Sequence, residues 1–223
     1  MSEIVAVRPL QKNMRKRIPF KNGEYYHIYN RGVEKREIFL CDFDYFRFFR
    51  SLKEFNQTDP VVSLYIKDRA LGVRPLRMLQ KDEKIVEIIS YCLNPNHFHL
   101  ILKQLKDGGI SEFVKRLSGG YTGYFNYKYK RTGVLFQGKF KSIHIDSNEY
   151  LLYLSAYVNG NYIIHKIDDK KWRFSSLNSN DGFSNLKLIS DQFKNADDYK
   201  RYVYSVAKQV REKREEMKKY LLE

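Results

Sequence analysis

Residues Ile85–Leu102 read IVEIISYCLNPNHFHLIL and carry the strongest structural signal in the chain. The run Ile85–Leu93 is almost continuously apolar and rich in residues that favour β-structure, which predicts a buried strand. The Asn-Pro-Asn tripeptide at 94–96 has the chemistry of a tight turn. His97–Leu102 is expected to return as the neighbouring strand. The sequence therefore predicts a tight antiparallel strand pair.

Strands and helices alternate on both sides of this pair. Tyr25–Arg31 is β-prone and ends at Gly32, and a short strand is expected over Ile143–Ile145. This alternation favours an α+β fold, in which helices pack on the faces of an antiparallel sheet. Helices are expected over about 42–55, 111–128, 149–164 and 196–222.

Side-chain chemistry indicates how the first three helices begin and what they bury. The stripe of Phe46, Phe49, Leu52 and Phe55 has helical spacing, so it is expected to face the core. Asp, Ser and Asn are favoured at helix N-termini. The expected caps are Asp42 or Asp44 for the first helix, Ser111 for the second, and Ser147 or Asn148 for the third.

Composition narrows the class of protein. The 223 residues suffice for one domain with an appendage, and two cysteines exclude a disulfide framework or a Cys-rich zinc site. No apolar run approaches the roughly 20 residues of a membrane span, and the first residues lack the apolar core of a secretion signal. We therefore expect a cytoplasmic protein with no membrane partner.

The charge points to nucleic acid. Lys and Arg number 41 against 26 Asp and Glu, a net charge of +15. Residues 111–144 hold seven cations against Glu112 alone, interleaved with Tyr and Phe, a pattern that suits a nucleic-acid backbone and unpaired bases. The alternative is a solvated basic surface with some of the rings in the core. The candidate backbone contacts are Arg31, Arg116, Lys128, Lys139 and Lys141.

His97 and His99 are two apart on the expected returning strand. Residues two apart on a strand face the same side, so both imidazoles project together and Phe98 enters the opposite layer. Paired imidazoles on a rigid strand can hold a metal ion. The alternative is a pair of partly buried histidines that are satisfied by hydrogen bonds.

The helix expected over 149–164 carries a second polar constellation. Tyr150, Tyr157 and Asn161 are seven and four residues apart, so they share one face. Tyr157 and Asn161 could present a phenol and an amide oxygen to one point. The alternative is a Tyr-rich amphipathic helix with its phenols at the core boundary, which we prefer for Tyr150 and Tyr153.

Four motifs stand in the order found in HUH-type single-tyrosine transposases: YYHIYNRG from Tyr25, ISYCLNPNHFHLIL from Ile89, LFQGKFKS from Leu135 and EYLLYLSAYVNGN from Glu149. Over roughly residues 20–175 the chain most resembles the branch associated with repetitive extragenic palindromes (REP). The resemblance implies an HUH endonuclease fold with a ferredoxin-like core. It implies His97, His99 and Asn161 as ligands of a divalent cation, Mg²⁺ or Mn²⁺, and Tyr157 as the nucleophile.

The resemblance also implies a reaction and a substrate. Tyr157 would attack a phosphodiester of single-stranded DNA beside a hairpin or palindrome, giving a 5′-phosphotyrosine and a free 3′-OH. Relatives occur as monomers and as homodimers. A metal-dependent hydrolase and a non-catalytic nucleic-acid-binding protein are the alternatives. The implied organisation is a basic arm over 1–22, the HUH transposase domain over 23–175 and a helical extension over 176–223.

Overall fold

The computed structural model describes residues 19–59, 83–167 and 172–220. The basic arm expected over 1–22 lies mostly outside these residues, as does the loop that the charged run 67–83, interrupted by Gly72 and Pro75, predicts. No helix in the described part is both long enough and apolar enough to cross a membrane.

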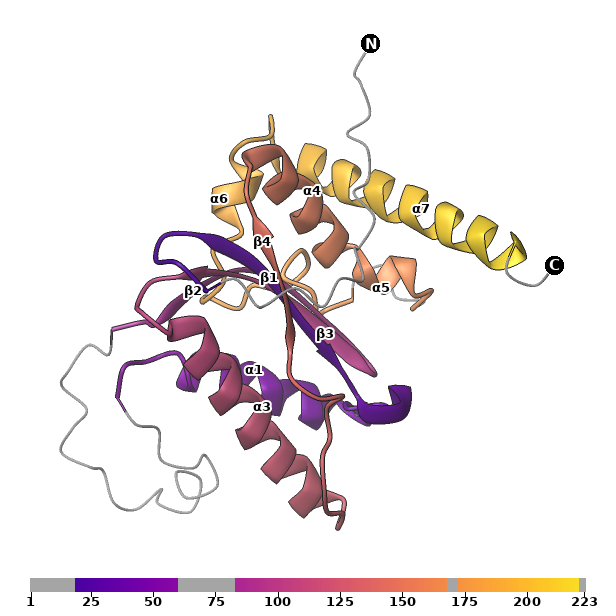
Figure 1. The fold of residues 1–223 in the computed structure, drawn as a ribbon. Coiled ribbons are helices and arrows are strands. Elements are labelled where there is room, and N and C mark those ends of the chain that lie inside the picture. Colours follow the sequence, from indigo (N-terminus) through magenta and orange to yellow (C-terminus); the bar gives the residue numbers. More distant parts are fainter. Residues whose placement is uncertain (1–18, 60–82, 168–171, 221–223) are drawn as a thin grey trace.

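A four-stranded antiparallel sheet forms the centre of the fold (Figure 1). Its strands are β1 (Tyr25–Arg31), β2 (Val86–Asn94), β3 (His97–Gln104) and β4 (Lys141–Ile145), in the order β2-β3-β1-β4. β2 and β3 form the expected pair, joined only by Pro95 and Asn96 because Asn94 is already paired with His97. Each predicted strand is confirmed.

Two helices connect these strands and cover one face of the sheet (Figure 1). α1 (Asp42–Glu54) follows β1 and a short 3₁₀ turn at Val33–Lys35, and α3 (Gly109–Lys128) joins β3 to β4. The chain order β-α-β-β-α-β with this strand order is the ferredoxin-like arrangement. The α+β fold with a ferredoxin-like core is thus confirmed.

The buried face of α1 matches the expected stripe only in part. Leu52 and Phe55 are buried and Phe49 is half-buried, as expected, but Phe46 is 50% exposed, and Tyr45 and Phe48 are buried instead. Packing of Tyr45 on Phe39 and of Phe48 on Tyr121 turns this side of the phenylalanine-rich helix toward the core. The expected caps of α1 and α3 were also wrong: Cys41 precedes α1, and α3 begins after Gly108, whose φ of 69° suits glycine.

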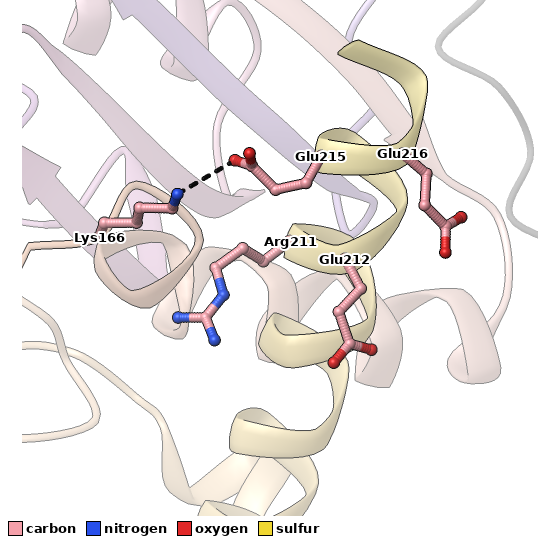
Figure 2. Close-up of a pocket in the computed structure, with 5 residues that line it drawn as sticks. All are labelled: Lys166, Arg211, Glu212, Glu215 and Glu216. Atoms are coloured by element: carbon pink, nitrogen blue, oxygen red, sulfur yellow. Dashed lines mark ion pairs between the residues drawn. The ribbon is translucent and has the colours of Figure 1, made fainter. Parts of the chain in front are cut away.

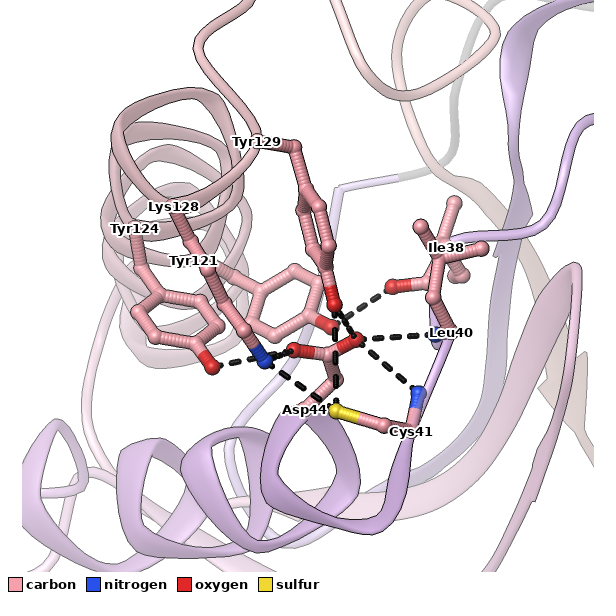
Figure 3. Close-up of polar contacts among 8 residues, drawn as sticks. All are labelled: Ile38, Leu40, Cys41, Asp44, Tyr121, Tyr124, Lys128 and Tyr129. Carbon is pink, nitrogen blue, oxygen red and sulfur yellow. Dashed lines mark hydrogen bonds and ion pairs between the residues drawn. The ribbon is translucent and has the colours of Figure 1, made fainter.

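Asp44 joins α1 to α3 (Figure 3). Its buried carboxylate accepts hydrogen bonds from the backbone N–H groups of Leu40 and Cys41, which replaces the expected side-chain cap. Three side chains of the α3 end also donate to this carboxylate: Lys128 Nζ at 2.6 Å, Tyr129 Oη at 2.7 Å and Tyr124 Oη at 2.9 Å.

The opposite face of the sheet is covered by the C-terminal helices (Figure 1). The expected helix over 149–164 is interrupted at Gly160, which divides it into α4 (Asn148–Asn159) and α5 (Asn161–Ile164). The Ser147 cap is confirmed, since Ser147 Oγ accepts from the Tyr150 N–H. α6 (Lys187–Ser190) and α7 (Ala196–Tyr220) follow, and α7 packs along α4 and α5.

Buried polar contacts anchor α7 to α4. Asn159 Nδ2 donates to Tyr199 Oη at 2.8 Å, and Tyr199 Oη donates to Ser155 Oγ at 3.2 Å. Asn159 Oδ1 accepts from Ser176 Oγ at 2.6 Å, on a segment that also bonds to Tyr91 in β2. A buried amide with every group satisfied contributes to stability and fixes one arrangement. The helix that carries Tyr157 is therefore held against both the sheet and α7.

Candidate active site

His97 and His99 both face the C-terminal helices. Phe98 lies in the core beneath α1 and α3, whereas Ile101, on the same side of β3 as the two histidines, lies in the core beneath α4 and α7. The predicted alternation of β3 is therefore present. On this face Asn94 pairs with His97, and Tyr29 pairs with His99, in the strands on either side.

The hydrogen bonds of His97 fix its tautomer. Its Nδ1 lies 2.6 Å from Asn96 Oδ1, and Asn96 is oriented by the donation of its Nδ2 to the Lys35 carbonyl. Because Asn96 Oδ1 can only accept, Nδ1 of the ring carries the proton. Burial is the largest influence on this group and lowers the pKa of His97, so the imidazole is neutral. Its Nε2 therefore presents a lone pair.

That lone pair converges with the amide oxygen of Asn161. His97 Nε2 and Asn161 Oδ1 lie 2.9 Å apart, and both accept from Asn94 Nδ2, at 2.8 and 2.6 Å. Two acceptors thus point toward one positively polarised group. Among the described residues, Asn161 Nδ2 is buried without a hydrogen-bond partner, so the oxygen of this amide makes its polar contacts.

His27 lies behind His99. His99 Nδ1 and His27 Nε2 are 2.8 Å apart. Burial lowers the pKa of His27 to about 3, and burial followed by the neighbouring imidazoles holds the pKa of His99 well below its usual value. Both rings are neutral, and the bond at Nδ1 leaves Nε2 of His99 for another partner. His27 therefore supports His99 from behind and lies one step away from the proposed ligand set.

The imidazole nitrogens of His97 and His99 and the amide oxygen of Asn161 are suitable ligands for a divalent cation. Metal-binding histidines normally have their second ring nitrogen held by another group, and Asn96 and His27 hold both Nδ1 atoms here. Adjacent ligands at about 2.1 Å from an octahedral ion are separated by roughly 3 Å, close to the 2.9 Å between His97 Nε2 and Asn161 Oδ1. Among the residues described, no three His, Cys, Asp or Glu side chains form a metal cluster, so the set relies on an amide.

Tyr157 lies beside this set. Its ring meets His99 edge to face at 5.7 Å and His27 at 6.1 Å, between centroids. The predicted sharing of one face by Tyr157 and Asn161 is present despite the break at Gly160. The structure also reveals a second phenol at the pair, since Tyr29 stacks on His99 with centroids 5.6 Å apart. Burial, followed by the phenols of Tyr157 and Tyr150, raises the pKa of Tyr29.

Two more residues complete the surroundings. The ring of His165, at the end of α5, lies 4.5 Å from that of His97 between centroids. Arg214 of α7 donates to Tyr157 Oη at 3.3 Å and lies 3.2 Å from His165 Nε2. Sequence reasoning missed Tyr29, Asn94, His165 and Arg214. Tyr29 and Asn94 could have been found from the register of the sheet, because they are the cross-strand neighbours of His99 and His97.

The five predicted DNA contacts fall into two groups. Arg31 pairs with His97 across the sheet, Lys141 pairs with Tyr29, and both are exposed, as is Lys139. Arg116 and Lys128 lie on α3, over the opposite face. Arg116 bonds to Glu112 and to the Gln57 and Asp59 carbonyls, and Lys128 pairs with Asp44.

Comparisons with known proteins bear on this geometry. Residues 74–161, less than half of the chain, match the model of the family "Transposase IS200 like". No curated protein matches the chain. Several solved structures are similar, two of which follow. A REP-associated tyrosine transposase bound to a REP hairpin has 16% identity and a TM-score of 0.47, over 74% of this chain and 82% of that one. A candidate transposase from Deinococcus radiodurans R1 has 14% identity and a TM-score of 0.37, over 65% and 95%.

The matched segment contains both histidines of β3, Tyr157 and Asn161, the residues that gather at the site. The resemblance to single-tyrosine transposases that the sequence motifs indicated is confirmed for this segment. Residues 74–161 of this chain are therefore similar to the IS200-like transposases.

Proposed function

We propose that this chain is a metal-dependent single-strand DNA endonuclease and strand transferase, of the REP-associated branch, that cuts beside hairpins or palindromes. The observation that carries the proposal is the convergence of Tyr157, His97, His99 and Asn161 at one place on the sheet. The proposed partner is single-stranded DNA, and we therefore expect the protein in the cytoplasm, associated with the nucleoid.

His97, His99 and Asn161 would hold Mg²⁺ or Mn²⁺, which, when bound, supplies Lewis-acid charge to a phosphate oxygen. Asn96 and His27 keep the two imidazoles in the orientation and tautomer that this role needs. Packing against His99 holds the phenol of Tyr157 at the same place. This rigid arrangement brings nucleophile and phosphate together without a search through rotamers.

The proposed step exchanges one phosphodiester for another. Tyr157 Oη forms a bond to phosphorus, and the bond from phosphorus to the 3′ oxygen breaks. The phenol proton leaves to water, and a water proton restores the 3′-OH, so that no net proton is consumed. The 5′-phosphotyrosine conserves the energy of the phosphodiester. A second 3′-OH can reverse the step and join new ends.

Label transfer tests the proposal. The protein is incubated with Mn²⁺ and internally ³²P-labelled single-stranded phage DNA, which contains many hairpins, then trimmed with nuclease and separated on an SDS gel. We expect label on the protein, its loss in Tyr157→Phe, and its retention in Tyr29→Phe, Tyr150→Phe and Tyr153→Phe. Tyr29→Phe is the sharpest control because this phenol also contacts His99.

The alternatives give different results in the same experiment. A hydrolase would release 5′-phosphate ends without labelling the protein. A non-catalytic binding protein would retain the DNA without cutting it, with any divalent metal. Label that persists in Tyr157→Phe and disappears in Tyr29→Phe would assign the nucleophile to β1 and contradict the role of Tyr157.

A further inference from the structure

Helix α7 lies outside the matched segment 74–161, yet it passes directly over the junction of α4 and α5 (Figure 1). A Cβ atom at Gly160 would lie 2.8 Å from Ala207 Cβ and 3.2 Å from Val203 Cγ1. The backbone at Gly160, which directly precedes Asn161, and helix α7 therefore approach each other closely. Because Ala207 and Val203 are buried, this contact fixes the position of α7.

A second contact holds the later turns of α7 against the end of α5. Lys166 Nζ pairs with Glu215 Oε1 at 3.4 Å, and both side chains line a surface pocket together with other side chains of α7 (Figure 2). Glu215 adjoins Arg214, and Lys166 adjoins His165. The pair is solvent-exposed, so its own contribution to stability is small. It nevertheless shows that α7 is seated on α5 where Arg214 reaches the site.

Arg214 connects the two halves of the active site. Its Nη2 donates to Tyr157 Oη at 3.3 Å, and its Nη1 lies 3.2 Å from His165 Nε2. The His165 ring in turn contacts the His97 ring. A chain of contacts thus runs from the proposed nucleophile, through one guanidinium, to a proposed metal ligand. A guanidinium suits this place because its five N–H donors form a planar fork that can hold several acceptors.

We propose that Arg214 is a further catalytic residue: it holds the Tyr157 hydroxyl against the histidine pair and places its positive charge beside the phosphate under attack. The inference rests on the proposed function. An attacking oxygen must come within about 3–3.5 Å of phosphorus. A guanidinium that contacts this oxygen consequently faces the phosphate, where a fixed charge stabilises the negative charge of the transition state.

The test uses the full chain in the label-transfer experiment, with protein in excess so that one turnover is followed at saturating DNA. We expect Arg214→Ala to lower the rate of adduct formation about 100-fold, the scale of losing one fixed donor at a reacting centre. Arg214→Lys keeps the positive charge, so its rate of adduct formation should be about tenfold higher than that of Arg214→Ala. Lys213→Ala removes one exposed charge from the neighbouring position of α7 and should remain within about twofold of wild type.

Two further measurements separate this role from structure and from affinity. Thermal unfolding should show Arg214→Ala and Arg214→Lys to be folded, and fluorescence anisotropy in a Tyr157→Phe background should show DNA affinity within about twofold of the parent. An unchanged adduct rate in Arg214→Ala, a loss confined to DNA affinity, or an equal loss in Lys213→Ala would each overturn the inference. Absence of the adduct from wild type would instead overturn the proposed function, and the inference with it.

Discussion

Asn161 contributes a neutral oxygen to a site whose other proposed ligands are two neutral imidazoles. None of the three proposed protein ligands is charged, and a hard divalent cation prefers oxygen ligands. Its affinity should therefore depend strongly on the one oxygen that the protein offers, Asn161 Oδ1. We predict that Asn161→Ala raises the Mn²⁺ concentration for half-maximal adduct formation about 10- to 100-fold, the usual scale for changes at such sites. Asn161→Asp, which adds a negative charge, should lower it.

A manganese titration of the label-transfer reaction measures this effect. Asn126→Ala is the control, because Asn126 bonds to the Gly133 carbonyl near the end of α3, over the other face of the sheet. Equal manganese requirements in Asn161→Ala and wild type would remove Asn161 from the ligand set.

Asp44 is the buried charge on which the contact of α1 with α3 depends. Burial alone would raise the pKa of Asp44, but the hydrogen bonds from Lys128, Tyr129, the Leu40 N–H and Tyr124 outweigh it and lower this pKa. A carboxyl whose pKa is lower in the folded than in the unfolded chain stabilises the fold above its unfolded pKa near 3.9. This stabilisation is lost as the pH falls through the folded pKa.

We therefore predict that Asp44→Asn lowers the free energy of unfolding at pH 7 by about 3 kcal/mol, because it leaves the donors around a buried site without a charged acceptor. The deficit should shrink as the pH is lowered through the acid range, measured by urea unfolding. Asp42→Asn is the matched control: Asp42 pairs with Arg173, but both side chains are more than half exposed, so the loss should stay below about 1 kcal/mol. A deficit for Asp44→Asn that does not depend on pH would contradict this account.

At the scale of elements, the seating of α7 on the junction of α4 and α5 places Arg214 beside Tyr157. Gly160→Ala would place a Cβ 2.8 Å from Ala207 Cβ and 3.0 Å from the Ala156 carbonyl oxygen. We predict a loss of about 1–3 kcal/mol in the free energy of unfolding, as for other overpacked cores. The adduct rate should fall as well, because α7 carries Arg214.

Gly119→Ala is the control for this substitution. Gly119 lies within α3 with nothing within 4 Å of its Cβ position, so alanine should stabilise the chain by about 0.4–1 kcal/mol. Urea unfolding compares the two variants. If Gly160→Ala were as stable and as active as wild type, the contact of α7 at this glycine would not control the site.

Local sequence patterns determined the parts of the fold that local physics controls. The apolar run of β2 and the spacing of His97 and His99 each predicted what the structure contains, and the turn predicted at 94–96 is present at 95–96, with Asn94 ending β2. The choice between Phe46 and Phe48 could not be predicted, because both lie on stripes of helical period and only the neighbouring layer selects one.

The same limit applies to the site. Tyr157 and Asn161 are four positions apart, so helical spacing brings them to one face. Arg214 is 57 residues from Tyr157 along the chain, and its place follows from how α7 packs. Asn159 looks unfavourable within a helix until its partner Tyr199 is known. Tertiary contacts of this kind leave no periodic signal.

At the scale of the whole molecule, the Lys and Arg side chains that give the net charge of +15 are not equally available to a DNA strand. Arg31, Lys139 and Lys141 are exposed at the β1 and β4 side of the site, whereas Lys128 is held by Asp44 and Arg116 by Glu112 and backbone carbonyls. Exposed cations beside the site can release the counterions of a DNA strand, which produces salt-dependent binding. We therefore expect the first group to dominate contact with the DNA backbone.

This expectation sets the last prediction. For single strands, each phosphate contact contributes about 0.7 to the slope of log affinity against log salt. We predict that Lys141→Ala, measured by fluorescence anisotropy in a Tyr157→Phe background over a range of NaCl concentrations, reduces this slope by about that amount. Lys115→Ala, which removes an exposed charge from α3, should leave it unchanged. Lys128→Ala should lower the free energy of unfolding while the slope stays the same, because its charge already faces Asp44. A slope that falls with Lys128→Ala and not with Lys141→Ala would move the DNA to the α3 side of the sheet, away from Tyr157.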